Sequence, residues 1–339
     1  GNPFSAHPKI DPETGRLVTF SYQICLGGSL KSGGLQTRFT IYELDQQYRV
    51  QRRLEHEFPG YAFMHDFAIT KNYYVMFHNP VDLEILPFMV GEKCPGECLV
   101  FDVDRPTRVH LIPRGPLPAG MPSEPVALEM ENCFVFHHAN AYEDENGCVV
   151  VDSVRLPELG ELLSRSDSDL PFQHVDWSDL PVTSIWRQTI SPWGALTKAV
   201  QTRQLSELFV EFPKVSPKVV GREYRYVYLA AGFNPRINSP LVSWLKLDMQ
   251  TGEETIWSAN NSTFVGEPEF VPRPGGIEED DGWLMGFLYD GSQHTSEFVI
   301  VDARHMSDPP IARLRLKHHI PHGLHGMFVN EYYGPSPFI

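Results

Sequence analysis

The sequence contains little cysteine, and this scarcity excludes one class of protein. Its 339 residues include five cysteines, an odd and sparse set that does not form the dense bridge pattern of a small secreted domain. We therefore expect free thiols in a reducing compartment. Cys94 and Cys98 are spaced like half of a metal site, but no second pair of cysteines completes it.

Long hydrophobic runs and clusters of basic residues are also missing. No stretch of about 18 apolar residues occurs, which argues against a membrane-spanning helix. The formal net charge is −15 and no basic cluster stands out, which argues against a nucleic-acid partner. The chain begins at Gly1 rather than at a methionine, so it gives no basis for predicting a targeting signal.

Helical periodicity is scarce, and short apolar runs rich in Val, Tyr, Phe and Ile take its place. Runs such as "YYVMFH", "CVVVDSV" and "EFVIVDA" are separated by glycines and prolines, of which the chain has 26 and 29. Short strands at regular spacing are typical of a β-sandwich, barrel or propeller. The sequence therefore predicts an all-β protein.

Four segments share one layout, which favours a propeller. Each has an apolar strand, an aspartate, a polar turn and a second strand, as expected for the outer hairpin of a propeller blade. The segments are "TIYELDQQYRVQRRLE", "CLVFDVDRPTRVHLIP", "SWLKLDMQTGEETIWS" and "FVIVDARHMSDPPIARLRL", and their aspartates are Asp45, Asp102, Asp248 and Asp302.

A histidine or a glutamate follows each of these hairpins, at a distance that suits a strand returning to the central axis. The distances from the aspartate are 20, 35, 19 and 23 residues, for His65, His137, Glu267 and His325 in turn. Imidazole is a preferred ligand of iron, copper, nickel and zinc. The spacing therefore predicts a ring of axial residues that bind a metal ion.

Carboxylates are expected around such a site, because neutral imidazoles leave the charge of the ion uncompensated. Glu211 in "LFVEFPKV" and Glu267 in "GEPEFVPRP" each stand in an apolar strand context, where an unpaired charge is costly. We interpret them as acceptors for the outer N–H groups of ligating histidines. The alternative is that each is a buried glutamate paired with the backbone or with an arginine.

Five motifs, in order along the chain, resemble the carotenoid cleavage oxygenases: "AHPKIDPETGRLVTFSYQ", "MHDFAITKNYYVMFHNP", "FHHANAYEDENGCVVVD", "GEPEFVPRPGGIEEDDGWLMGFLYD" and "HGLHGMFV". The resemblance implies a seven-bladed β-propeller with Fe(II) on its axis, capped by short helices and loops. It implies four iron ligands, His7, His65, His137 and His325, so that His138 and His322 are neighbours rather than ligands. Two of the family's three supporting glutamates match Glu211 and Glu267.

The resemblance covers the C-terminal two-thirds of a family member. We therefore expect residues 1–339 to form a single β-propeller domain that lacks the family's N-terminal portion, so that the ring of blades is incomplete in this chain. We expect short helices near residues 81–90 and between about 164 and 205, where the second segment crosses the outside of the core or covers an entrance.

The implied activity is that of a non-haem iron dioxygenase, which cleaves a C=C bond of a carotenoid or apocarotenoid with O2 to give two carbonyl products. The partners are then an apolar polyene and O2. Phe136 and Leu324 each precede a predicted ligand, so we expect both to line the substrate cavity; the alternative is core packing. The oligomeric state cannot be predicted.

A polyene substrate dissolves in membranes, and one loop is unusually apolar. "VDLEILPFMVGEK" contains Ile85, Leu86, Phe88 and Met89, which we expect to contact lipid at a peripheral membrane site. The alternative is that the loop packs on its own core. The predicted location is the cytoplasm or a plastid, in soluble or peripherally attached form.

Competing functions are a stilbenoid-cleaving or an isomerohydrolase activity of the same family, a metal-free propeller that serves as a binding scaffold, and a zinc hydrolase. Zinc hydrolases usually have three protein ligands and a nearby general base. The remaining histidines are expected at the surface or in loops, among them His56, His78, His110, His174, His294 and His305.

Overall fold

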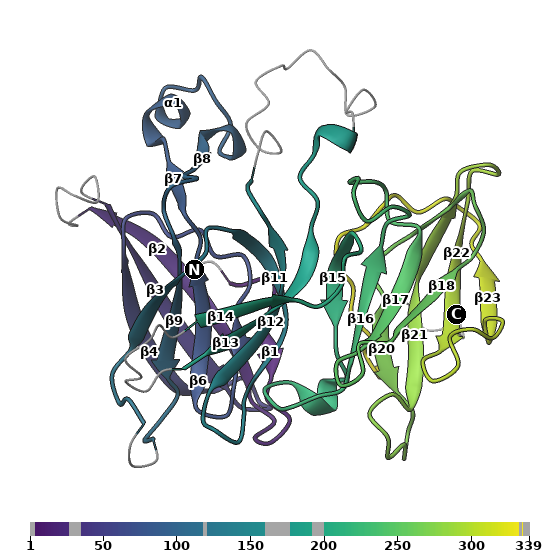
Figure 1. Cartoon of the computed structure of the whole chain (residues 1–339), viewed down its shortest axis with the longest axis horizontal. Helices are drawn as coiled ribbons and strands as arrows, with labels where there is room; N and C mark the ends of the chain where they lie inside the picture. Colours follow the sequence, from purple (N-terminus) through teal and green to yellow (C-terminus); the bar gives the residue numbers. More distant parts are fainter. Residues whose placement is uncertain are drawn as a thin grey trace.

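The computed structural model of the chain is built almost entirely of antiparallel β-sheet (Figure 1). It describes residues 4–26, 35–117, 121–159, 177–191, 200–331 and 334. The helices in these ranges are short: α1 (Ile85–Met89) and the 3-10 turns η2 (Gly96–Cys98), η5 (Trp177–Asp179) and η6 (Pro217–Val219). None of them has the length and apolar character needed to span a bilayer. The predicted all-β class is confirmed.

Five sheets of four or five strands follow one another along the chain. The first contains β1 (Lys9–Ile10), β2 (Leu17–Leu26), β3 (Leu35–Leu44) and β4 (Val50–Pro59). The second contains β5 (Ala68–Ile69), β6 (Tyr73–His78), β9 (Thr107–Pro113) and β10 (Val126–Met130). The third contains β11 (Phe134–Glu143), β12 (Val149–Leu156), β13 (Ser184–Ile190) and β14 (Val200–Gln204).

The last two sheets complete the described part of the chain. The fourth contains β15 (Val210–Lys214), β16 (Tyr226–Ala231), β17 (Ser243–Asp248) and β18 (Glu254–Ser258). The fifth contains β19 (Thr263–Val265), β20 (Glu269–Pro272), β21 (Gly282–Asp290), β22 (Thr295–Asp302) and β23 (Ala312–Arg315). A separate two-stranded hairpin, β7 (Val81–Leu83) with β8 (Leu99–Phe101), carries α1 at its tip (Figure 1).

Each of the first four sheets runs from one edge to the other in chain order, the topology of a propeller blade. Buried hydrophobic clusters lie between consecutive sheets. One joins Phe39 of the first sheet to Met76 of the second, and another joins Leu229 of the fourth to Ile185 of the third. Each sheet is therefore fixed by its neighbours. The described residues form five such sheets, and the seven blades stay a prediction.

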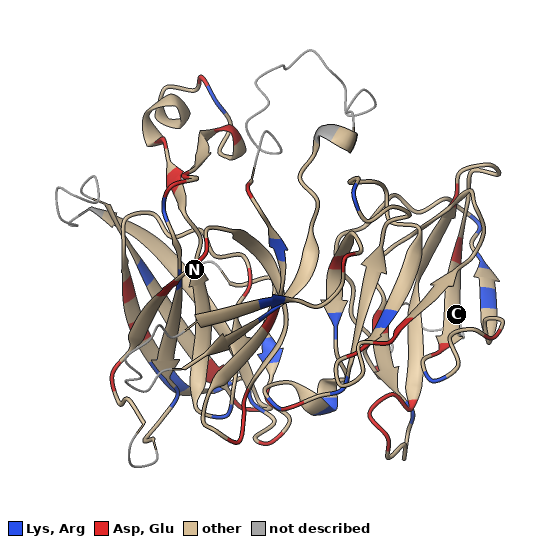
Figure 2. Cartoon of the chain, in the orientation of Figure 1, with Lys and Arg blue, Asp and Glu red and all other residues tan. Residues whose placement is uncertain are grey.

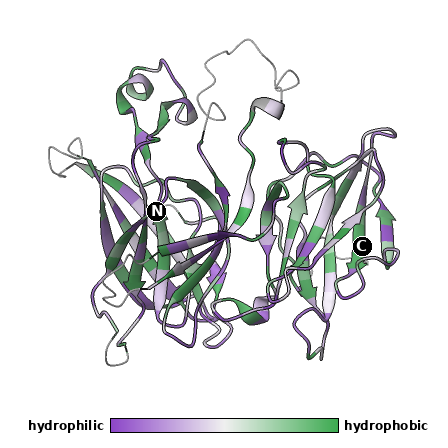
Figure 3. Cartoon of the chain, viewed as in Figure 1, coloured by the Kyte–Doolittle hydropathy of each residue, from purple (hydrophilic) through white to green (hydrophobic). Residues whose placement is uncertain are grey.

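Colouring by charge and hydropathy supports this division of roles. Charged residues gather mainly at turns and strand ends (Figure 2), while hydrophobic residues run along the strands (Figure 3). The core is thus made by strand faces, and the polar groups that remain near the axis need a specific partner.

Three of the four predicted outer hairpins are confirmed: β3–β4, β17–β18 and β22–β23. Their aspartates stabilise the turns, since a carboxylate oxygen of Asp45 accepts hydrogen bonds from the backbone N–H groups of Gln47 and Arg49. The prediction around Asp102 is wrong. The strand before it, β8, pairs with β7 outside the blade, and β9 and β10 form the outer pair of the second sheet.

The segment between about 164 and 205 also differs from expectation. Part of it lies outside the described residues. The part that is described contains η5 and supplies β13 and β14, which complete the third sheet instead of crossing its outside. The short helix expected near residues 81–90 is confirmed by α1.

Candidate metal centre

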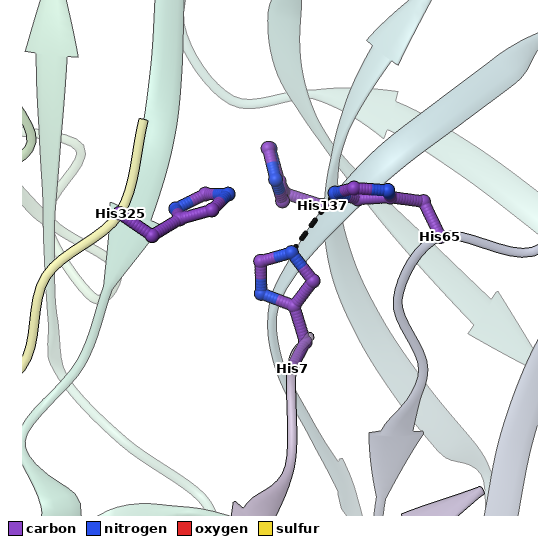
Figure 4. A group of neighbouring side chains, drawn as sticks. All are labelled: His7, His65, His137 and His325. Atoms are coloured by element: carbon purple, nitrogen blue, oxygen red, sulfur yellow. Dashed lines mark hydrogen bonds between the residues drawn. The ribbon is translucent and has the colours of Figure 1, made fainter. Parts of the chain in front are cut away.

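Four histidines that are far apart in the sequence meet where the inner strands of the sheets converge (Figure 4). His7 lies two residues before β1, His65 three residues before β5 and His137 within β11, while His325 belongs to the segment after β23. Each offers one ring nitrogen, and these four atoms all lie within 4.8 Å of one another. The Nε2 atoms of His7 and His65 are 2.9 Å apart.

This spacing suits a single metal ion. Nitrogen ligands held about 2.1 Å from one ion lie about 3 to 4 Å apart, so small side-chain adjustments would bring all four nitrogens into bonding distance. Within the described ranges, no other group of three or more His, Cys, Asp or Glu side chains gathers in this way. The donor set is entirely imidazole, which suits iron, copper, nickel and zinc better than the hard cations calcium and magnesium.

A glutamate holds the outer ring nitrogen of two of these histidines. Glu211 lies 2.8 Å from Nδ1 of His137, and Glu267 lies 3.1 Å from Nδ1 of His325. A carboxylate on Nδ1 places the proton there and leaves Nε2 free to bind a metal. Nε2 of His137 is buried and has no hydrogen-bond partner in the described structure. A bound ion would satisfy this nitrogen, so the residues present fit a metal.

The pKa values of the four rings differ with their surroundings. Burial lowers the pKa of His7 to about 3 and also lowers the pKa of His65, so both are neutral at pH 7, as a ligand must be. Burial alone would lower the pKa of His137 too, but the charge and hydrogen bond of Glu211 outweigh it and raise that pKa. A proton therefore competes with a metal ion more strongly at His137 than at His7 or His65.

A distortion of strand β15 places Glu211. Phe212 adopts a positive φ of 56°, and the pairing with β16 shifts register between Glu211 and Lys214. In this conformation the Phe212 N–H donates to the same Glu211 oxygen that faces His137, at 2.5 Å. The Phe212 ring centroid lies 5.7 Å from that of His137 and 5.4 Å from that of His325. Sequence analysis missed Phe212, because a β-bulge leaves no clear signal in a single sequence.

Glu267 sits in a more heavily paired environment. It accepts the backbone N–H of Gly326 at 2.9 Å and forms an ion pair with Lys214 at 3.0 Å. Burial alone would raise its pKa, but the hydrogen bond from His325 and the charge of Lys214 lower it. The carboxylate therefore stays ionised while it orients His325.

The second histidine of the HH pair and the first histidine of the HxxH motif lie outside the cluster. His138 is buried, with Nδ1 2.8 Å from the Ser153 hydroxyl, and burial lowers its pKa to about 4. His322 lies beside Tyr289, with ring centroids 5.8 Å apart. The structure thus brings His137 and His325, but not His138 and His322, into the cluster; their role as metal ligands stays a prediction.

The family model described as RPE65, retinal pigment epithelial membrane protein, matches residues 1–330. The chain belongs to this family, the carotenoid cleavage oxygenases. It is 42% identical over 332 residues to apocarotenoid-15,15'-oxygenase of Synechocystis, covering 96% of this chain and 63% of that protein. It is 29% identical over 345 residues to a carotenoid 9,10(9',10')-cleavage dioxygenase of Crocus sativus, covering 97% of this chain and 58% of that protein.

The fold agrees with that membership. The crystal structure of cobalt-substituted Synechocystis ACO superposes with a TM-score of 0.86 at 41% identity, covering 96% of this chain and 64% of that one. The chain thus spans less than two thirds of the length of these relatives. The family resemblance and the propeller fold inferred from the sequence are confirmed.

The two residues expected to line a substrate cavity both adjoin the four-histidine centre. The Phe136 ring centroid lies 5.5 Å from that of His65 and packs against Phe134 at 4.5 Å. Leu324 is 73% exposed and lines an apolar groove of about 270 Å³ beside His325. Phe136 is half-buried among aromatic rings, whereas Leu324 has no such packing; their role toward substrate stays a prediction.

The four residues expected to contact a membrane lie on or beside a free surface. Helix α1 has no buried residue, and Leu86 and Met89 are 74% and 71% exposed. Ile85 and Phe88 are exposed as well. The alternative, that this loop packs on its own core, is wrong, because the β7–β8 hairpin holds α1 away from the sheets (Figure 1).

Surface positions were expected for His56, His78 and His110, and this expectation is wrong. His56, His78 and His110 surround Phe58, with ring centroids 4.7, 5.6 and 4.6 Å from the Phe58 ring. Strands β4, β6 and β9 bring them together. Burial lowers the pKa of all three, to about 4 for His78 and about 3 for His110. His174 lies outside the described residues.

Proposed function

We propose that this chain carries the catalytic metal centre of an oxygenase that cleaves a C=C bond of a carotenoid or apocarotenoid. The reaction adds both atoms of O2 across the broken bond and yields two carbonyl products. The observation that carries the proposal is the group of four imidazole nitrogens within 4.8 Å, two of them backed by partly buried glutamates. Similarity to a protein named apocarotenoid-15,15'-oxygenase supports the substrate class.

We propose Fe(II) as the ion, held by His7, His65, His137 and His325. Bound there, iron would supply the electrons that activate O2. The protein's own part is to keep Nδ1 of His137 and His325 protonated through Glu211 and Glu267, so that Nε2 faces the ion. Phe136 and Leu324 are proposed to offer apolar contacts to the polyene and to reduce water near the reacting bond.

The test is anaerobic reconstitution of the chain with Fe(II), followed by O2 and a panel of C40 carotenoids, shorter apocarotenoids and one stilbene. We expect a pair of aldehydes or ketones from one cleaved bond of a carotenoid or apocarotenoid, labelled from 18O2 in both products and identified by mass. Cleavage of the stilbene alone would favour the stilbenoid alternative. An iron-loaded chain that cleaves none of them would contradict the proposal.

We also propose that α1 gives the protein a peripheral membrane contact through Ile85, Leu86, Phe88 and Met89. Full burial of one such side chain is worth about 1.5 to 3 kcal/mol, so Leu86→Ser with Met89→Ser should lower partitioning onto neutral liposomes more than tenfold. Val50, another exposed apolar residue, lies on β4 and gives the matched control Val50→Ser. Equal flotation of both variants with liposomes would argue against the contact.

A further inference from the structure

Two of the four histidines at the metal centre have no carboxylate partner. In the described part of the chain, Glu211 and Glu267 orient His137 and His325, but no acidic side chain hydrogen-bonds to the ring of His7 or His65. The Nε2 atoms of these two rings lie 2.9 Å apart, so a proton on one of them makes a hydrogen bond between the rings. A metal ion needs both nitrogens without a proton, and this hydrogen bond is then lost. The positions of the two rings for metal binding therefore depend on the backbone segments that carry them.

One buried carboxylate connects those segments. Asp66 directly follows His65, and one of its oxygens lies 2.8 Å from Nζ of Lys9, two residues after His7. Its other oxygen accepts the backbone N–H of His138 at 2.9 Å. The Asp66 side chain is 2% exposed and that of Lys9 is 20% exposed, so water screens this pair only weakly.

The contact to His138 coincides with an irregularity of strand β11. The pairing of β11 with β12 shifts register on both sides of His138, and the N–H of His138 turns to Asp66. A bulge of this kind changes the direction of the side chains beside it, and the side chain next to it is that of His137. Asp66 thus contacts the segments of His7, His65 and His137 at once.

We propose that Asp66 is a positioning residue that holds three of the four histidines in register for metal binding. It acts through Lys9 on His7, through the chain on His65, and through the backbone of His138 on His137. The inference rests on the proposed metal centre but not on the proposed substrate or reaction.

The test is Asp66→Asn, read out by cobalt binding. Asparagine keeps the size of the side chain but loses the charge that pairs with Lys9 and offers an oxygen on one side only. We expect Co(II) affinity to fall at least tenfold, in the range found when groups that orient metal ligands are removed. We also expect the visible ligand-field absorption of bound Co(II) to change shape, because the arrangement of nitrogens has changed.

Asp152→Asn is the matched control. Asp152 is also fully buried and pairs with Arg187 at 2.8 Å and with the Tyr224 hydroxyl at 2.7 Å, but it contacts none of the four histidines. Its loss should lower stability while leaving the Co(II) affinity and spectrum of the folded protein unchanged. If both variants alter the spectrum alike, Asp66 acts on general stability and the inference is wrong.

Lys9→Met provides a second test should Asp66→Asn fail to fold. It removes the ion pair, while Asp66 still accepts hydrogen bonds from the backbone N–H groups of Phe67 and His138. The Co(II) spectrum of Lys9→Met should therefore change, whereas Lys9→Arg, which keeps the positive charge, should have the wild-type spectrum. Wild-type affinity and spectrum in Asp66→Asn would overturn the inference. If the unmodified protein bound no Co(II), the metal centre itself would be refuted, whereas normal Co(II) binding without polyene cleavage would refute the proposed reaction alone.

Discussion

Replacing Glu211 by glutamine tests whether a carboxylate on the outer nitrogen prepares His137 for metal binding. In the structure, one Glu211 oxygen accepts from Nδ1 of His137 at 2.8 Å and from the N–H of Phe212 at 2.5 Å. Glutamine can keep an oxygen there, but the negative charge is lost. If its amide group turns instead, Nδ1 of His137 has to accept, the proton moves to Nε2, and the ligand atom is no longer available.

The two cases set the expected magnitude. A hydrogen bond to a charged partner is worth about 1.5 to 3 kcal/mol and a neutral one about 1 kcal/mol, so losing the charge alone costs about 1 to 2 kcal/mol. A turned amide adds the cost of shifting the tautomer. We therefore expect Glu211→Gln to weaken metal binding about 10- to 100-fold, equivalent to about 1.4 to 2.8 kcal/mol.

The assay is an anaerobic titration of the protein with Fe(II) or Co(II) at pH 7, in which calorimetry measures the heat of binding and so the affinity. Glu129→Gln is the control. Glu129 lies on β10, forms an exposed ion pair with Arg108 of β9, and is not part of the metal centre. This variant should bind metal as the unmodified protein does. If Glu211→Gln also binds with unchanged affinity while its circular dichroism is native, the carboxylate does not set the tautomer of His137.

Three further outcomes follow from the geometry. His137→Ala should lose bound metal in an elemental analysis, whereas His138→Ala should retain it and lose stability, because His138 is buried against Ser153; the reverse pattern would exchange their roles. The folded state disfavours protonated His110, whose pKa lies near 3, so about 2 kcal/mol of stability should be lost as the pH falls from 6.5 to 5. Urea unfolding at pH 7 and pH 5 should show a smaller difference for His110→Phe, and an equal difference would contradict this origin. Zinc should occupy the four-histidine centre without supporting cleavage, because it has no redox chemistry; turnover with zinc, measured by carbonyl products, would refute oxygen activation by the metal.

The arrangement of the centre could be predicted from sequence to the extent that the repeat determines it. The hairpins that turn near Asp45 and Asp302 predict where along the sequence the chain returns to the axis. His65 and His325 follow these aspartates by 20 and 23 residues, which is the spacing expected for that return. His7 precedes every hairpin in this chain, so only the family resemblance could suggest it. The excursion from β7 to β8 interrupts the repeat, and the blade prediction at Asp102 therefore failed.

What the sequence could not provide are contacts made by side chains from different sheets or by irregular backbone. His56 lies between Glu55 and Glu57, as a surface residue often does, yet its ring meets that of His110 beside Phe58. Phe212 has a positive φ that no local pattern announces. Burial of this kind depends on which strands become neighbours, and a single sequence does not state it.

The charges around the four histidines give a reason for a dication at this position. Asp66 is paired with Lys9, and Glu267 shares Lys214 with Glu269. Glu211 contacts no lysine or arginine among the described residues and meets His137 and the Phe212 N–H. Four carboxylates and two ammonium groups leave two negative charges beside the rings. Burial would lower the pKa of His137, but the charge and hydrogen bond of Glu211 raise it. A divalent ion held by four neutral imidazoles would bring the two positive charges that balance these carboxylates.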